Sequence, residues 1–382
     1  MLGFASLLMD ASSEAIHSVL PLFLVTTLGA SLITVGEIEG LAESVASILK
    51  IFSGALSDYI GKRKVIVVTG YGLAALSKPL FAIATTPAMV LFARLSDRVG
   101  KGIRGAPRDA LIADSTEPAV RGAAFGLRQS LDTVGAFIGP LIAFTILSVW
   151  HDDFRKVFWC AVLPAVLCVM LLLFGVKEPE KKQAPAGKNP LKWEVLKSLG
   201  RPYWLLMTVA LFFSLGNSSD AFLLIRAKQN GIPENTIPLA LVVMNVVYSS
   251  TAYPIGKLSD SIGRRGLLTG GLLLYALVYA GFAFATTPWQ IWILFATYGL
   301  HLGLTQGILL ALVSDQVGPD HRGTAFGFAN LVTGIALLPA SMLAGILWQH
   351  VGPYATFLAG SAFAVVSAIA LQCVPSAQRR SQ

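Results

Sequence analysis

The chain has 382 residues, of which 54% are hydrophobic and 13% are charged, about half the charged share of an ordinary soluble domain. A soluble globular protein of this length is excluded, because so few charges could not cover its surface. The net charge of +8 could indicate a nucleic-acid-binding protein, but the basic residues gather in short loops between apolar stretches. This placement is typical of membrane loops beside anionic lipid, and we expect no nucleic-acid partner.

Twelve apolar stretches are each about twenty residues long, the length that an α-helix needs to cross a bilayer. The sequence therefore predicts an all-α membrane protein with twelve transmembrane helices. A polar segment separates six stretches from the other six, which predicts a first six-helix bundle at 1–176, a cytoplasmic linker at 177–202 and a second bundle at 203–382. The twelve stretches are 3–27, 33–57, 65–84, 88–112, 123–149, 157–176, 203–225, 237–258, 267–286, 288–313, 323–348 and 352–374.

Twelve spans place both termini on one side of the membrane. The lysines and arginines of the linker and of short loops such as 62–64 and 264–265 assign that side to the cytoplasm. The first stretch carries Asp10 and Glu14 where the core of a secretory signal is purely apolar, so we expect no cleavable signal and leave open whether the chain begins upstream of Met1. We expect a monomeric, multi-pass protein of the cell membrane.

The two halves of the chain repeat each other. Residues 54–63 recur at 256–265, and residues 121–126 recur at 322–327. A Ser-Ser-acid-Ala sequence that begins at Ser12 recurs from Ser218, and all these separations lie between 201 and 206 residues. Chance would not keep one separation over several motifs, so six spans are duplicated in the same orientation. Parallel repeats around a binding site at the bilayer midplane are typical of transporters.

The loop after the second span has the elements of a tight turn. Gly61 allows the bend, Asp58 can face a helix N-terminus, and we expect the basic pair Lys62 and Arg63 to stay in water. The pattern Gly-x-Leu-x-Asp-x-x-Gly-basic-basic is present in both copies. We predict that this loop acts in gating through Gly54, Asp58, Gly61, Lys62, Arg63, Gly256, Asp260, Gly263, Arg264 and Arg265.

On these motifs the chain resembles the major facilitator superfamily over its whole length, either its drug/proton antiporters or an uncharacterised prokaryotic branch. The resemblance implies two six-helix bundles related by a pseudo-two-fold axis, which transport a solute by alternating access. It also implies that the duplicated loop latches the two halves as they rock, and that spans 1, 2, 4 and 5 of each half line the cavity. No enzymatic activity, cofactor or metal site is expected.

Charged residues inside the predicted spans point to the same cavity. Each Arg, Lys or Asp at a helix centre costs about 2.5–3.5 kcal/mol on insertion, so these side chains must face protein or water. Arg94, Arg98 and Lys101 share one face of the fourth span, because they are four and three residues apart. The charged faces belong to spans one, two, four and five, while span three carries only Lys78. Glu39 lies near the outer mouth, where solvation by water accounts for it.

The candidate site residues follow from these faces. A static network of salt bridges remains an alternative for any one of them. The proton-coupling candidates are Asp10, Glu14, Glu43 and Asp132, and the inner-gate candidates are Arg104, Arg108 and Asp109. The substrate-cavity candidates are Arg94, Arg98, Lys101, Arg128, Asp220, Asn245, His301 and Gln306.

We predict a secondary transporter that exports a small organic solute in exchange for protons. A proton-coupled importer of a small organic anion remains open, because the cations of the fourth span suit a carboxylate or phosphate. A divalent-metal exporter also remains open, although the pair Glu14 and His17 has no further histidines beside it. A membrane-embedded enzyme is disfavoured, because the sequence offers no arrangement of nucleophile and base.

Overall fold

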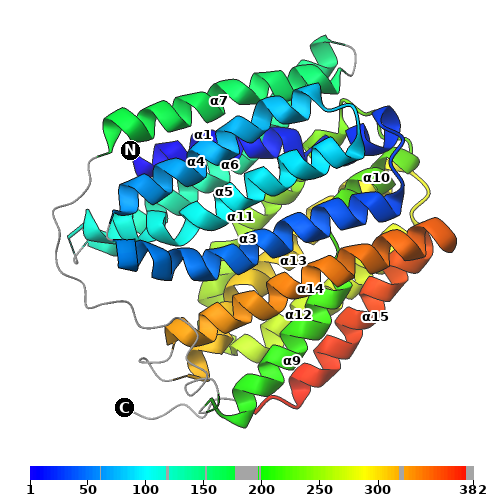
Figure 1. Cartoon of the computed structure of the whole chain (residues 1–382). Helices are drawn as coiled ribbons and strands as arrows, with labels where there is room; N and C mark the ends of the chain where they lie inside the picture. The colour runs from blue at the N-terminus through cyan, green and yellow to red at the C-terminus, as the bar shows by residue number, and fades with distance from the viewer. Residues whose placement is uncertain are drawn as a thin grey trace.

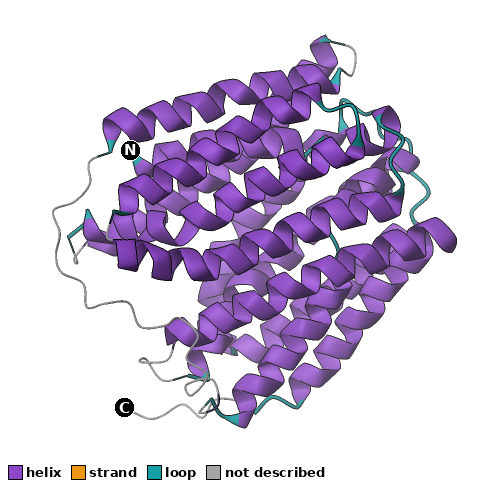
Figure 2. Ribbon diagram, viewed as in Figure 1, coloured by secondary structure: helices purple, strands orange, loops and turns teal. Residues whose placement is uncertain are grey.

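The computed structural model describes residues 1–60, 62–117, 120–150, 153–176, 197, 199–317 and 322–375. All regular structure in these ranges is helical, which confirms the predicted all-α fold (Figure 2). Gly61 and most of the linker predicted at 177–202 lie outside the described residues. The proposed domain boundaries therefore stay predictions.

The helices follow the predicted spans to within a few residues and form two groups (Figure 1). The first group comprises α1 Leu2–His17, α2 Leu20–Leu22, the π-helical turn η1 Phe23–Thr27, α3 Leu32–Ile60, α4 Arg63–Ile83, α5 Pro87–Asp114, α6 Arg121–Val149 and α7 Phe154–Gly175. The second group comprises α9 Arg201–Gly216, α10 Ala221–Gln229, α11 Ile237–Ile262, α12 Arg264–Phe284, α13 Pro288–Asp315, α14 Arg322–His350 and α15 Pro353–Gln372.

Ten helical segments of the described residues are long and apolar enough to cross a membrane. The other two predicted spans correspond to α3 and α5, which are 29 and 28 residues long but too rich in charged residues to qualify by composition. Both helices pack inside the bundle beside helices that do qualify. Twelve spans remain the predicted number.

The first and seventh spans, which the repeat pairs, each contain a break. In the first span α1 ends at His17, and helical structure resumes at Leu20 with Pro21 in the first turn of α2. In the seventh span α9 ends at Gly216, and the chain is non-helical until α10 begins at Ala221. Broken helices expose backbone groups in the membrane and commonly mark the solute site of a transporter.

The duplicated loops lie at one end of the bundle, on the left in Figure 1. We call this end the basic end, and the end at which α5 and α13 begin the opposite end. Gly263 ends α11 with φ +100°, a conformation that suits only glycine, so the second copy forms the expected turn. Gly54 brings α3 close to α5, since a Cβ there would lie 3.3 Å from Ala106 Cβ, while Gly256 has open space around it.

The expectation that both residues of each basic pair stay in water is wrong. Arg63 pairs with Asp114 and donates to Ala110 O at 3.2 Å, both at the C-terminal end of α5. In the second half Arg264, which like Arg63 is the first residue of its helix, lies 2.5 Å from Asp315 and donates to Ala311 O at 3.3 Å. The carbonyls at a helix C-terminus lack intrahelical partners and attract cations. Lys62 remains exposed, Arg265 donates to Gln372 O, and the side chains of Asp58 and Asp260 are not among those described.

The two halves meet most closely where α3 packs along α14. Glycines make this contact possible: a Cβ on Gly36 would overlap Ser341 O, and one on Gly345 would lie 2.5 Å from Leu32 O. Small residues let helix backbones approach in a membrane, where dispersion replaces the hydrophobic effect as the source of affinity. The α3–α14 contact therefore holds the halves together from the opposite end towards the middle.

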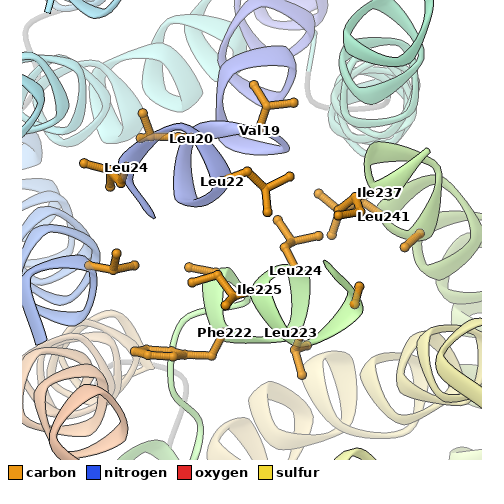
Figure 3. Close-up of a cluster of buried hydrophobic side chains, with 14 of the residues drawn as sticks. Val19, Leu20, Leu22, Leu24, Phe222, Leu223, Leu224, Ile225, Ile237 and Leu241 are labelled. Atoms are coloured by element: carbon orange, nitrogen blue, oxygen red, sulfur yellow. The ribbon is translucent and has the colours of Figure 1, made fainter. Parts of the chain in front are cut away.

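A layer of buried apolar side chains closes the opposite end (Figure 3). Leu22 of α2 and Leu224 of α10 point towards one another across the boundary between the halves, beside Ile237 and Leu241 of α11. All of these side chains are less than 5% exposed. The molecule is thus closed at the opposite end.

We expect Gly36→Ala to destabilise this closed arrangement by about 1–3 kcal/mol, because the added methyl group collides with the α14 backbone. The thermal unfolding midpoint of the purified protein in detergent measures the effect. Gly72→Ala is the matched control, since nothing lies within 4 Å of a Cβ there and alanine favours a helix by about 0.5–1 kcal/mol over glycine. Equal midpoints for the two variants would show that the α3–α14 contact is looser than described.

Candidate functional site: a charged cavity between the two halves

A cavity of about 330 Å³ lies between the two halves, from the middle of the molecule towards the basic end. Helices α1, α3, α5 and α6 of the first half line it, as expected for spans one, two, four and five, and α11 and α13 line it from the second half. The charged lining residues are Asp10, Glu14, Lys50, Lys101, Arg104, Arg108 and Asp132. The neutral lining residues from the second half are Asn245, Tyr248 and Gln306.

Most of the charged lining residues were expected at the site from the sequence. The lining residues that were missed include Lys50, Gln129 and Tyr248. Lys50 shares the charged face of the second span. It was not chosen as a candidate, because it lies away from the centre of the span. Gln129 and Tyr248 are uncharged, so the high free energy of inserting a charge into the membrane did not mark them as candidates. Tyr248 lies one helical turn from Asn245, so helical spacing from a predicted cavity residue could have found it.

Arg94 and Arg98 do share one face of α5, but this face meets α3 instead of the cavity. Arg94 Nη2 lies 2.7 Å from Glu39 Oε2, and Arg98 Nη2 lies 2.9 Å from Glu43 Oε1. Glu39 and Glu43 are four residues apart on α3, as the two arginines are on α5. The two pairs therefore form a ladder of ion pairs between α3 and α5. Glu39 is fully buried, which corrects the expectation that water solvates it.

His17 connects this ladder to the end of α1. Its Nε2 lies 3.7 Å from Glu39 Oε2, and its Nδ1 lies 3.5 Å from Glu14 Oε2. Glu14 in turn lines the cavity. The broken first span therefore joins the cavity to the buried charges of α3 and α5 through a single imidazole.

Lys78, the lone charge of the third span, is 1% exposed and has partners that the sequence did not reveal. Its Nζ lies 2.7 Å from Asp97 Oδ1 and donates to Ser13 Oγ at 2.8 Å. This buried pair ties α4 to α5 and α1. In the second half the repeat places Tyr279 and Tyr298 at the positions of Lys78 and Asp97.

Near the basic end, α5 and α6 share a second network. Arg128 Nη1 lies 2.6 Å from Asp132 Oδ2, and Arg108 donates to Asp109 Oδ1 at 3.1 Å and to Ser6 Oγ at 2.7 Å. Arg108 Nη1 is also 4.0 Å from Asp132 Oδ2. These contacts all lie within the first half, so the role of Arg104, Arg108 and Asp109 in an inner gate stays a prediction.

Asp220 and His301 do not line this cavity. Tyr298 donates to Asp220 Oδ1 at 3.1 Å, and His301 Nδ1 lies 2.8 Å from Gly271 O. Both belong to a packed aromatic cluster in which the Tyr275 ring lies 4.9 Å from the His301 ring. The tyrosine hydroxyls satisfy buried polar groups here, which explains why few charges are needed in the second half.

Three charged side chains in the cavity lack close partners. Asp10, Lys50 and Lys101 make no hydrogen bond and no ion pair within 4 Å of another described residue. The other four charged lining residues each have a described contact: Glu14 with His17, Arg104 with the Tyr71 ring, Arg108 with Asp109, and Asp132 with Arg128. The cavity therefore offers one available carboxylate and two available ammonium groups.

A charged cavity between two repeated helical bundles, closed at one end, defines a secondary transporter. The sequence model of the Major Facilitator Superfamily matches residues 2–226 and again residues 221–381, and the chain belongs to this superfamily. The uncharacterized MFS-type transporter MJ1317 of Methanocaldococcus jannaschii is 36% identical over 379 residues, covering 97% of this chain and 93% of the relative.

More distant relatives and solved structures agree with this membership. The class C tetracycline resistance protein of Escherichia coli is 26% identical over 343 residues, covering 85% of this chain and 82% of the relative. A D-xylose-proton symporter superimposes with a TM-score of 0.77 at 18% identity, covering 98% of this chain and 97% of that one. A bacterial homolog of the lysosomal transporter Spinster, inward-facing and occupied, superimposes with a TM-score of 0.80 at 15% identity, with 98% and 95% covered. At these identities the structures show the shared fold alone.

We expect Glu39→Gln to lower the free energy of unfolding by about 3–5 kcal/mol, because it removes the closest counter-charge of the buried Arg94 guanidinium and leaves only Glu43, at 3.7 Å. Glu37→Gln is the matched control on the same helix. Its carboxylate is exposed, and the change should stay within about 0.5 kcal/mol. Chemical denaturation in detergent micelles measures both variants. A Glu39→Gln protein as stable as the Glu37→Gln protein would contradict the ladder between α3 and α5.

Proposed function

We propose that this protein is a proton-coupled secondary transporter in which Asp10 and Glu14 carry the proton. The observation that carries the proposal is the lack of a close cationic partner for Asp10, which nevertheless faces the cavity. A carboxylate without a close cation can exchange protons with cavity water. The described ion pair of Glu14 is with His17, whose imidazole can itself bind a proton.

The closed opposite end supports alternating access as the mechanism. The positive-inside rule orients the basic end to the cytoplasm, so the cavity lies on the inner side and the conformation faces inward. Exposure of the cavity to the outside then requires α3 to separate from α14 and the apolar layer around Leu22 and Leu224 to open. Ion pairs within one half need not break during this movement.

Export in exchange for protons is the first candidate for the direction of transport. It is supported by relatives whose names state resistance to drugs: the class C tetracycline resistance protein and, at 27% identity, the multidrug resistance protein MdtH of Photorhabdus laumondii. Import of an organic anion together with a proton is the second candidate, and the ammonium groups of Lys50 and Lys101 in the cavity favour it. Export of a divalent metal has less support, because the described residues contain no group of three His, Cys, Asp or Glu side chains that could hold one.

We expect Asp10→Asn to abolish transport driven by a pH gradient in proteoliposomes while solute exchange without a gradient persists. The amide cannot take up a proton, but it keeps the shape of the cavity. A pH-sensitive dye inside the vesicles reports proton movement when tetracycline or benzoate is added, and its direction relative to the solute separates antiport from symport.

Asp153→Asn is the control for this experiment, since Asp153 caps α7 at the opposite end, away from the cavity. It should leave coupled transport unchanged. Full coupling in the double variant Asp10→Asn with Glu14→Gln would rule out these two carboxylates as proton carriers.

A further inference from the structure

We infer that the cavity binds organic solutes through a carboxylate or phosphate group, held by Lys50, Lys101 and Arg104, with the uncharged part of the solute against the second half. The inference rests on the proposed function only in taking this cavity as the solute site. It does not depend on which residue carries the proton or on the direction of transport.

The three cations come together from two adjacent helices. Lys101 and Arg104 are three residues apart on α5 and therefore lie on neighbouring turns of one face. Lys50 reaches the same place from α3, with its aliphatic chain beside Gly105, where a Cβ would lie 3.6 Å from Lys50 Cγ. The absence of a side chain at Gly105 leaves room for the lysine to extend along α5 into the cavity.

We call Lys50, Lys101 and Arg104 the cradle. Arg104 indicates that the cradle can bind a hydrogen-bond acceptor. Its side chain is 4% exposed, and its guanidinium carbon lies 4.4 Å from the centre of the Tyr71 ring. Stacking on the ring holds the charged group in place without using its donors. Arg104 Nη1 is buried and has no hydrogen-bond partner. A buried donor without a partner is unfavourable, so an anion that accepts from it is stabilised.

The acidic residues of the cavity do not neutralise this cradle by direct contact. Asp132 is held by Arg128, and Glu14 is oriented towards His17. Glu43, Glu14 and Asp10 attract Lys101, each from a distance beyond that of an ion pair. The ammonium groups of Lys50 and Lys101 are exposed to the cavity, where a solute can reach them.

The second half supplies hydrogen bonds in place of charges. Tyr248 Oη donates to Gln306 Oε1 at 3.0 Å, which leaves the amide N–H groups of Gln306 and the side chain of Asn245 to meet a solute. The repeat places Leu302 and Thr305 at the positions of Lys101 and Arg104, so the cations have no counterpart across the cavity. A solute therefore binds in one orientation, with its anionic group towards the first half.

Binding to the purified full-length protein in nanodiscs tests the inference. The probes are inorganic phosphate, benzoate, phenyl phosphate, the neutral isostere benzamide and the cation tetraphenylphosphonium, each titrated by isothermal calorimetry. We expect at least one of the three anions to bind and benzamide and tetraphenylphosphonium not to bind. Preference between benzoate and phenyl phosphate separates a carboxylate site from a phosphate site.

Variants assign the binding to the cradle. Lys101→Gln and Lys50→Gln should each weaken the anion's affinity about tenfold, the effect of one lost charge-assisted hydrogen bond. Lys156→Gln is the matched control, because Lys156 lies near the start of α7 and pairs with Asp153. It should bind as the unmodified protein does. Arg104 is not substituted, because its burial makes misfolding a competing explanation.

Three results would overturn the inference: binding of tetraphenylphosphonium in preference to the anions, no binding by any of the three anions, or unchanged anion affinity in both lysine variants. The Asp10→Asn protein separates this inference from the proposed proton coupling. Anion binding retained in that variant, with coupling lost, supports both. If the Asp10→Asn protein keeps its coupling and only the lysine variants weaken anion binding, the proton assignment is wrong and the anion site is supported.

Discussion

Charges inside a bilayer must be paired or face water, and the pairing of α3 with α5 is the constraint on which the first half depends. Glu39 and Glu43 on one helix meet Arg94 and Arg98 on the other, so the rotation of each helix about its axis is determined by the same contacts. Further along α5 towards the basic end, Lys101 and Arg104 line the cavity instead. The same rotation directs α3 towards α14, where its glycines meet the second half. One pattern of buried ion pairs thus positions both the cavity and the contact between the halves.

The two halves satisfy the same fold with different chemistry. Each half keeps an arginine that binds the C-terminal end of a neighbouring helix. Arg63 binds the end of α5, and Arg264 binds the end of α13. Inside the membrane, however, tyrosines replace a lysine–aspartate pair, since Tyr279 and Tyr298 stand where Lys78 and Asp97 stand in the first half. A hydroxyl avoids the desolvation penalty of a charge. Tyr298 donates to Asp220, whereas the buried Tyr279 hydroxyl has no hydrogen-bond partner among the described residues. The membrane interior of the second half is therefore largely neutral, whereas that of the first half is charged. The proposed proton and anion sites both lie in the first half.

Hydropathy and the internal repeat predicted the fold well, because both report local properties of the chain. The fourth span, predicted at 88–112, is α5 Pro87–Asp114, and the cavity is lined by the four spans of the first half that carry charges. Partners were harder to predict. Arg94 and Arg98 were expected in the cavity, but the acids that bind them lie on another helix, and sequence spacing does not show how two helices are rotated towards each other. Asp220 and His301 were misplaced for a similar reason, because the tyrosines that enclose them are distant in sequence and uncharged. Lys50 and Tyr248 show the converse, since they become notable only when the opposite wall of the cavity is known.

The uneven distribution of charge has an electrical consequence. With every group ionised, the four basic and three acidic side chains that line the cavity leave one positive charge, and the described lining residues of the second half add none. A charge that crosses the whole membrane field changes in energy by about 2.3 kcal/mol per 100 mV. A bound monovalent anion would cancel the cavity charge, whereas a proton on Asp10 would add one positive charge. The membrane potential would therefore act more strongly on the proton-loaded carrier than on the carrier that holds only an anion.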